Sequence, residues 1–335
     1  MKKLVLITFL TFIFMASCKK ESHDYQPDSG PVKLVTLSDG AGTSFTMLEF
    51  ISITAFDSIQ LNLEEKVNTS EDQFIAENSS LSDSLLNEKE IETGFKYHQP
   101  LIEFEKSLNF TNSMRQIFVL EEEDWLNHED LDEKTDPSLI YVFDIFEMTM
   151  LNEDGEMKIG NSLIKLTNEG FVEFKDGDIN KLIRFNNGDM SVLDDTNVFT
   201  NLNENPPKSD CVSWKGANVW DTYANNKKVN KKVHFHSWPW KGSSEAQITS
   251  YRYRNHRWSE YRMSLGVALQ SKFYGPGCET LNVSAWSGWK RLPRKNLVKY
   301  YNNWGSFQFN RAKNGDSVVG YFEYAGNSNT LVLSW

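Results

Sequence analysis

Residues 250–278 read SYRYRNHRWSEYRMSLGVALQSKFYGPGC and hold the clearest strand pattern in the chain. Just before and within this stretch the side chains alternate between two faces, with Ile248, Ser250, Arg252 and Arg254 on one and Thr249, Tyr251 and Tyr253 on the other. Residues 263–273 continue as a longer strand, and GPG at 275–277 supplies a turn. The pattern predicts antiparallel strands in this part of the chain.

Further short strands are predicted on both sides of this stretch. Residues 281–289 (LNVSAWSGW) form one, and the alternating segments around Phe307, Tyr321 and Leu331 form others, separated by NG at 314–315 and GN at 326–327. Strands at this spacing predict an all-β, antiparallel sandwich or barrel-like domain over residues 206–335. LPRKNLVKYYNNW (292–304) is interpreted as a short helix.

The charge of the chain changes sign near residue 205. Residues 209–335 carry 18 Lys or Arg against 7 Asp or Glu, although the whole chain has a net charge of −11. NLNENPPKSD (201–210), with two adjacent prolines, supplies a break. We therefore divide the chain into an acidic α+β domain (31–205) and a basic, aromatic-rich β domain (206–335). Three interpretations are open: the two domains face each other and their charges cancel, the basic domain meets an anionic ligand, or the charges serve solubility alone.

The acidic domain mixes helical and strand patterns. Leu48 and Phe50 alternate as in a strand, and a helical spacing of apolar residues follows Thr54, which is the expected N-cap. LIEFEKSLNF (101–110) reads as a helix, and the apolar runs after Asp136 alternate with Gly-containing turns as in a β-meander. DGDIN (176–180) begins like a calcium loop, but Lys181 stands where an EF-hand requires glycine, so that motif is excluded.

The N-terminus reads as a lipoprotein leader over residues 1–17. Two lysines precede an apolar run at 4–15 that is too short to span a bilayer. MASC (15–18) resembles a bacterial lipobox, which implies cleavage before Cys18 and acylation of that residue. Residues 18–30 would then be the lipidated cysteine and a polar tether.

A second resemblance supports export. LNEDGEMKIGNSLIKLTNEGFVEF (151–174) resembles a recurring segment of uncharacterised exported lipoproteins of the Bacteroidota, over about residues 45–180. This resemblance implies only an exported family without an assigned activity. ASCKKE (16–21) resembles the start of many lipoproteins of the Bacteroidota. Together with the lipobox it implies an outer membrane lipoprotein, held to the membrane by its N-terminal acyl anchor and facing the periplasm or the cell surface.

Cysteines and histidines offer two further hypotheses. Cys211 and Cys278 are the cysteines left to pair in an oxidising compartment, and a disulfide between them would stabilise the fold by about 4 kcal/mol. His234 and His236 project from one face of a predicted strand, as two zinc ligands do, with His256 as a possible third. The alternative is that they are ordinary strand histidines without a metal.

Interleaved aromatic and basic residues form the main candidate binding surface. They are Trp238, Trp240, Tyr251, Arg252, Tyr253, Arg254 and Trp258, with a second group at 286–291 (WSGWKR). Flat aromatic faces stack on sugar rings, and Arg binds carboxylate, sulfate or phosphate. The turn from Trp238 to Trp240 is expected at the surface, whereas core packing is the alternative for most of these side chains.

No stretch matches a catalytic fingerprint, so no catalytic residue and no cofactor are assigned. The composition favours a membrane-anchored, non-catalytic protein that binds an acidic polysaccharide or another envelope component. Nucleic acid fits the surface chemistry but not the expected compartment. The alternatives are a structural protein in an envelope complex and a metal-dependent hydrolase using His234, His236 and His256.

Overall fold

The computed structural model describes residues 30–128, 135–141, 143–200, 202, 211–212, 214–274, 280–302, 312–313 and 317–334. Pro31–Trp335 form one compact unit. The predicted leader, Cys18 and the predicted domain boundary at 205–206 lie outside the described residues. The N-terminal part of the unit is α+β and the C-terminal part consists of antiparallel strands, which confirms the predicted fold class.

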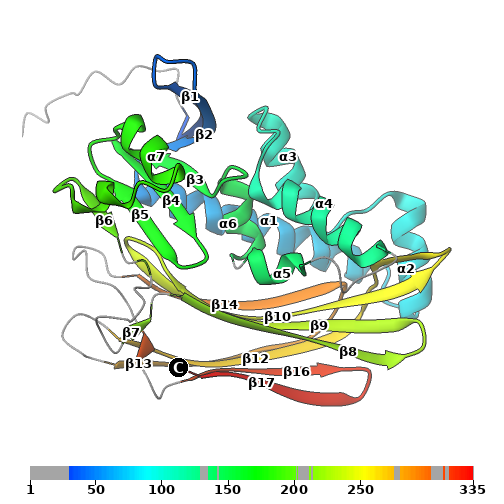
Figure 1. Cartoon of the computed structure of the whole chain (residues 1–335). Coiled ribbons are helices and arrows are strands. Elements are labelled where there is room, and N and C mark those ends of the chain that lie inside the picture. The colour runs from blue at the N-terminus through cyan, green and yellow to red at the C-terminus, as the bar shows by residue number, and fades with distance from the viewer. Residues whose placement is uncertain are drawn as a thin grey trace, which may run out of the picture. The chain divides into compact units, whose positions relative to one another are not determined.

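Six strands and a layer of helices make up the N-terminal part (Figure 1). The strands form one sheet in chain order: β1 (Val32–Ser38), β2 (Ser44–Phe50), β3 (Glu156–Ile159), β4 (Ser162–Thr167), β5 (Gly170–Phe174) and β6 (Val198–Thr200). The helical layer consists of α1 (Ile53–Glu77), α2 (Asp83–Thr93), α3 (Gln99–Ser107), α4 (Met114–Asn127), α5 (Pro137–Ile140) and α6 (Ile145–Met150). Helix α7 (Ile179–Asn186) and the 3₁₀ turn η2 (Met190–Asp194) lie between β5 and β6 in the chain.

Two local predictions in this part are corrected. Helix α1 begins after Ser52 rather than Thr54, because the Ser52 hydroxyl accepts a hydrogen bond from the Ala55 amide at 3.1 Å. Within the apolar run at 139–151, residues 145–150 form helix α6 and not a strand, and Asp144 caps this helix by accepting from the Phe146 and Glu147 amides. The following runs form the antiparallel strands β3, β4 and β5, as the meander pattern predicted.

The C-terminal part contains two stacked sheets (Figure 1). The inner sheet lies next to the helical layer and consists of β8 (Trp214–Ala224), β9 (Lys227–Ser237), β10 (Lys241–Arg254), β11 (Arg257–Glu260) and β14 (Arg294–Asn302). The outer sheet consists of β13 (Thr280–Leu292), β12 (Met263–Tyr274), β16 (Ser317–Tyr324) and β17 (Asn327–Ser334) in that order. Two short strands, β7 (Cys211–Val212) and β15 (Ala312–Lys313), pair with each other.

Strand β14 replaces the helix that was predicted over 292–304. Its backbone pairs with β10 from Lys241↔Asn302 to Thr249↔Arg294. Without β14, this length of β10 would present unpaired amides and carbonyls in the interior, which is costly. Pairing with a distant strand therefore overrides the local pattern.

Strand β10 is the centre of the layered fold, because both of its faces are buried between Lys241 and Tyr251. One face packs on the outer sheet, where Ala246 and Ile248 join the core between the two sheets. The other face meets the helical layer, where Tyr251 joins Trp125 and Leu126 of α4. The predicted alternation of residues 248–254 is thereby confirmed. Among the described residues, no helix has the length and apolar character needed to cross a membrane.

Candidate functional site

The turn that contains Trp238 is interior, so the prediction of an exposed turn is wrong. Trp238 and Pro239 are buried and Trp240 is half-buried. The ring centroids of Trp238 and Trp240 lie 5.2 and 5.5 Å from that of Phe56 in α1. Helix α1 covers the turn, and this long-range packing removes the surface that the local sequence suggested.

The other predicted binding residues separate into buried and exposed groups. Tyr251 is buried, and its hydroxyl donates to Glu122 Oε1 of α4 at 2.8 Å. Trp258 is half-buried, and its ring centroid lies 5.3 Å from that of Tyr253. Arg252, Tyr253 and Arg254 lie at the solvent end of β10. The seven residues therefore do not form one surface, and ligand binding by the exposed ones stays a prediction.

Lys228 joins the helical layer to the inner sheet through aromatic rings. Its ammonium lies 4.4 Å from the ring centroid of Trp258, 4.7 Å from that of Trp220 and 5.7 Å from that of Trp125 in α4. Attraction to the rings stabilises the cation. Burial nevertheless lowers the pKa of Lys228 to about 8, because a desolvated ammonium is disfavoured.

We expect Lys228→Met to raise the free energy of unfolding at pH 7 by about 1 kcal/mol, because it replaces a desolvated cation with an apolar chain of similar length. The pKa of Lys228 is lower in the folded than in the unfolded protein, so the stability of the wild type should rise from about pH 8 to above pH 10. The advantage of the variant should shrink over that window. Urea unfolding at several pH values measures the difference in stability between Lys228→Met and the wild type. Lys66→Met, at an exposed position, is the control. A difference that is the same at all pH values would contradict the lowered pKa of Lys228.

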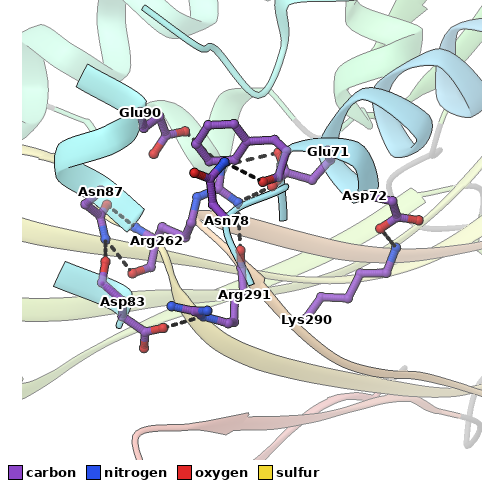
Figure 2. A network of polar contacts seen from close by, with 10 residues as sticks. Glu71, Asp72, Asn78, Asp83, Asn87, Glu90, Arg262, Lys290 and Arg291 are labelled. Atoms are coloured by element: carbon purple, nitrogen blue, oxygen red, sulfur yellow. Dashed lines mark hydrogen bonds and ion pairs between the residues drawn. The ribbon is translucent and has the colours of Figure 1, made fainter. Parts of the chain in front are cut away.

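Three basic side chains of the C-terminal part, Arg262, Lys290 and Arg291, pair with carboxylates of α1 and α2 (Figure 2). Arg262, at the start of β12, is fully buried and forms ion pairs with Glu71 of α1 and Glu90 of α2. Asn87 binds the backbone of the same arginine, accepting from its N–H at 2.8 Å and donating to its carbonyl at 2.9 Å. Arg291 pairs with Asp83 at 2.6 Å.

The same arrangement recurs farther along the interface. Arg294 of β14 donates to Glu122 of α4 at 2.9 Å and to Glu260 of β11 at 2.8 Å. Lys241 donates to Gln60 of α1 at 2.6 Å. These contacts agree with the interpretation in which the acidic and basic parts face each other. The cations that form them are not available to bind an external anion.

The three candidate metal ligands are not brought together. His234 is buried in β9, and its Nε2 lies 3.1 Å from Glu245 Oε2 on β10. His256 lies in the exposed turn between β10 and β11, about 35 Å along the strand direction from Glu245. Nothing is described of the His236 side chain. Among the described residues no group of three His, Cys, Asp or Glu has the geometry of a metal site. Cys278 lies outside the described residues, so the predicted disulfide stays a prediction.

An irregularity in β13 creates an aromatic surface that the sequence pattern did not reveal. Trp286 and Trp289 are three residues apart, so a regular strand would send them to opposite faces. The register with β12 shifts by one residue here, from Gly266↔Trp289 to Ala268↔Trp286. Gly288 adopts φ +68°, the left-handed conformation that such a bulge uses. Both rings consequently point to the solvent face of the outer sheet.

We call this surface the aromatic platform; it comprises Trp286, Trp289, Tyr321, Gln270 and Glu323. The two Trp side chains are 49% and 51% exposed and their ring centroids lie 6.3 Å apart at 82°. Tyr321, 37% exposed, lies across β12 from Trp286, and its hydroxyl donates to Gln270 Oε1 at 3.2 Å.

Gly266 allows Trp286 to approach β12 closely. A Cβ at this position would lie 2.7 Å from Cη2 of Trp286 and 3.4 Å from Oε2 of Glu323. The indole therefore rests on the backbone of β12. The signal that could have found the platform is Trp-Ser-Gly-Trp at 286–289, in which a glycine within a strand pattern marks a bulge.

Comparisons with known proteins add little. No protein-family model matches the chain, and no curated protein matches it. Among solved structures, a DUF4848 family protein from Bacteroides thetaiotaomicron aligns at 13% identity over 90% of this chain and 100% of that one, with a TM-score of 0.20. At that TM-score the alignment carries no argument about fold or function.

Proposed function

We propose that the protein is an exported, lipid-anchored binding protein that captures an uncharged glycan on the aromatic platform. The observation that carries the proposal is the pair of exposed indoles that the Gly288 bulge turns to one face. The membrane anchor rests on the leader and Cys18, as inferred from the sequence. Binding rather than catalysis agrees with the absence of a catalytic fingerprint in the sequence.

The chemistry of the platform suits a sugar chain. Stacking on an aromatic ring contributes about 1–3 kcal/mol for a planar base, and the apolar face of a pyranose packs on indole in a similar way. Tyr321 and Trp286 are on strands separated by β12, so their backbones lie about 10 Å apart, a distance that two consecutive sugar rings can bridge. The Gln270 amide and the Glu323 carboxylate offer hydrogen bonds to sugar hydroxyls between the rings.

The charge of the platform favours an uncharged glycan over the acidic polysaccharide that the composition suggested. On β16, Glu323 is the charged side chain of this face. Arg291, two residues beyond Trp289 on β13, follows the same face but is paired with Asp83 at 2.6 Å. The cations that could have bound an anionic chain, such as Arg262 and Arg294, are paired with carboxylates in the interior. A polyanion would meet a carboxylate here without a compensating charge.

Titration of the mature protein with polysaccharides tests the proposal. We expect saturable quenching or shift of Trp fluorescence with at least one uncharged polysaccharide from a panel of β-glucan, xylan and mannan. Trp286→Ala and Trp289→Ala should each weaken binding by about 1–3 kcal/mol, or roughly 5- to 150-fold in Kd. The control is Tyr253→Ala, which removes an exposed aromatic ring from the inner sheet.

Two results would oppose the proposal. One is failure of every uncharged polysaccharide to bind, with an envelope protein co-purifying instead, which is what a structural role predicts. The other is binding that both Trp variants leave unchanged. Binding of polygalacturonate or heparin alone would retain a glycan-binding role but refute an uncharged ligand.

A further inference from the structure

A cavity lies on the opposite side of the inner sheet from the aromatic platform. Its volume is 670 Å³, which is within the range of about 300–1,000 Å³ of small-molecule sites. It is bounded by α2, α3 and α4 on one side and by β10, β11 and the start of β14 on the other. Apolar and aromatic walls are supplied by Ile91, Phe95, Tyr97, Val119, Leu126 and Trp258.

One border of the cavity is a carboxylate–guanidinium–carboxylate triad. Arg294 is buried and binds both Glu122 and Glu260, and these three residues all line the cavity. The second oxygen of Glu122 accepts from Tyr251. Two carboxylates share one guanidinium, so the triad has one negative charge in excess. Burial raises the pKa of Glu122, while Arg294 opposes the increase.

A second triad of the same composition borders the cavity elsewhere. Arg262 lies between Glu71 and Glu90, and Glu90 lines the cavity (Figure 2). This triad also has one negative charge in excess.

The other charged side chains that line the cavity pair with each other, pair with residues outside the cavity, or are exposed to solvent. Glu123 and Arg257 pair with each other at the rim, Arg115 is bound by Glu105, and Lys96 is exposed. The interior border of the cavity therefore has an excess of negative charge.

Three atoms of residues that line the cavity have no hydrogen-bond partner among the described residues, and all three are acceptors. Glu260 binds Arg294 through Oε1, and Glu90 binds Arg262 through Oε1; among the described residues neither Oε2 has a hydrogen-bond partner. His98 also lines the cavity, and its buried Nε2 has no partner among the described residues. Burial, reinforced by Arg294 and Arg115, lowers the pKa of His98 well below its usual range, so the imidazole is neutral and has one acceptor nitrogen.

We propose that this cavity binds an organic cation, a protonated amine on a compact apolar or aromatic body. The ammonium can donate to the Oε2 atoms of Glu260 and Glu90, which Arg294 and Arg262 leave unbound, and its charge offsets the excess of the two triads. The aromatic side chains of Phe95, Tyr97 and Trp258 line the cavity and can pack against the apolar body. The site is independent of glycan binding, since the platform lies on the far face of the outer sheet.

Three small molecules of the same shape test the charge preference directly. Isothermal titration of the full mature chain at pH 7 would compare 2-phenylethylamine, 2-phenylethanol and phenylacetate. We expect the amine to bind at least tenfold more tightly than the alcohol, and the anion to bind least. Glu260→Gln keeps an oxygen for Arg294 and removes the excess charge of its triad, so it should weaken the amine at least fivefold without changing the alcohol.

The controls separate charge from folding and shape. Glu323→Gln removes a carboxylate from the aromatic platform and should leave amine binding unchanged. Val119→Trp should abolish binding of all three molecules by filling the cavity, whereas Leu120→Trp, at a position 64% exposed, should not. The urea midpoint of each variant shows that it is folded, and Glu90→Gln replaces Glu260→Gln if the latter is not. Equal affinity for the amine and the alcohol, or a folded carboxylate variant that binds the amine as the wild type does, would overturn the proposal.

Discussion

Replacing Arg262 with leucine is expected to lower the free energy of unfolding by about 3–5 kcal/mol, which is the cost of breaking a buried ion pair from one side. The guanidinium is fully buried between Glu71 and Glu90, and Glu71 is also buried. Burial already raises the pKa of the Glu71 carboxyl even with Arg262 in place. Without the arginine, Glu71 must remain charged without its ion pair or take up a proton. Either outcome destabilises the contact between α1 and the start of β12.

A matched control comes from the same network (Figure 2). Lys290 pairs with Asp72 at 2.8 Å, but their side chains are 36% and 58% exposed, so Lys290→Ala should cost less than about 1 kcal/mol. Adding Glu71→Leu to Arg262→Leu should restore part of the lost free energy of unfolding, because it removes the buried carboxylate that Arg262→Leu leaves unpaired. Urea midpoints measure all four proteins. Equal losses for Arg262→Leu and Lys290→Ala would show that the buried triad does not hold the layers together.

Local patterns in the sequence predicted where several strands lie, but not which strands pair with each other. Alternation identified β10 and β12 because strand periodicity is a property of the chain itself. The helix interpretation of 292–304 failed because β14 is stabilised by nine paired positions on β10, more than 40 residues away. Periodicity does not report such pairing.

The charge pattern identified two complementary surfaces without indicating what each contacts. Arg262 and Arg294 belong to the part of the chain that the sequence predicts as a basic domain, yet each is paired with carboxylates of the helical layer or of β11. Trp238 likewise reads as a turn residue, and it is buried because it packs on Phe56 of α1 within the core of the N-terminal part. Complementary partners more than 150 residues apart cannot be matched from a single sequence.

The aromatic platform is a case where one backbone conformation decides the surface. Trp286 and Trp289 would lie on opposite faces of a regular strand, and one of them would then enter the core beside Leu265 and Val267. The left-handed Gly288 turns both outward. A glycine in a strand indicates such a bulge but does not establish it, which is why the sequence favoured the residues near 251–254 instead.

Replacing Gly320 with valine is expected to destabilise the protein by about 2 kcal/mol, although valine is the better strand former. Gly320 lies on the inner face of β16, opposite Leu269 of β12 and Leu331 of β17. A Cβ there would lie 2.6 Å from Cγ2 of Val233 on β9 and 2.7 Å from Cζ of Phe322. Strand preference contributes at most about 1 kcal/mol, so the clash between the two sheets decides the sign.

Two comparisons isolate the clash in urea unfolding. Ser328→Val adds a β-branched chain to the exposed face of the same sheet and should change stability by less than about 0.5 kcal/mol. In a double-mutant cycle, the cost of Gly320→Ala should fall by about 1 kcal/mol when Val233→Ala removes the contacting methyl group. A higher urea midpoint for Gly320→Val would mean that strand preference outweighs packing. No coupling in the cycle would mean that the clash is relieved at Phe322 rather than at β9, because the Phe322 ring is the other group in contact.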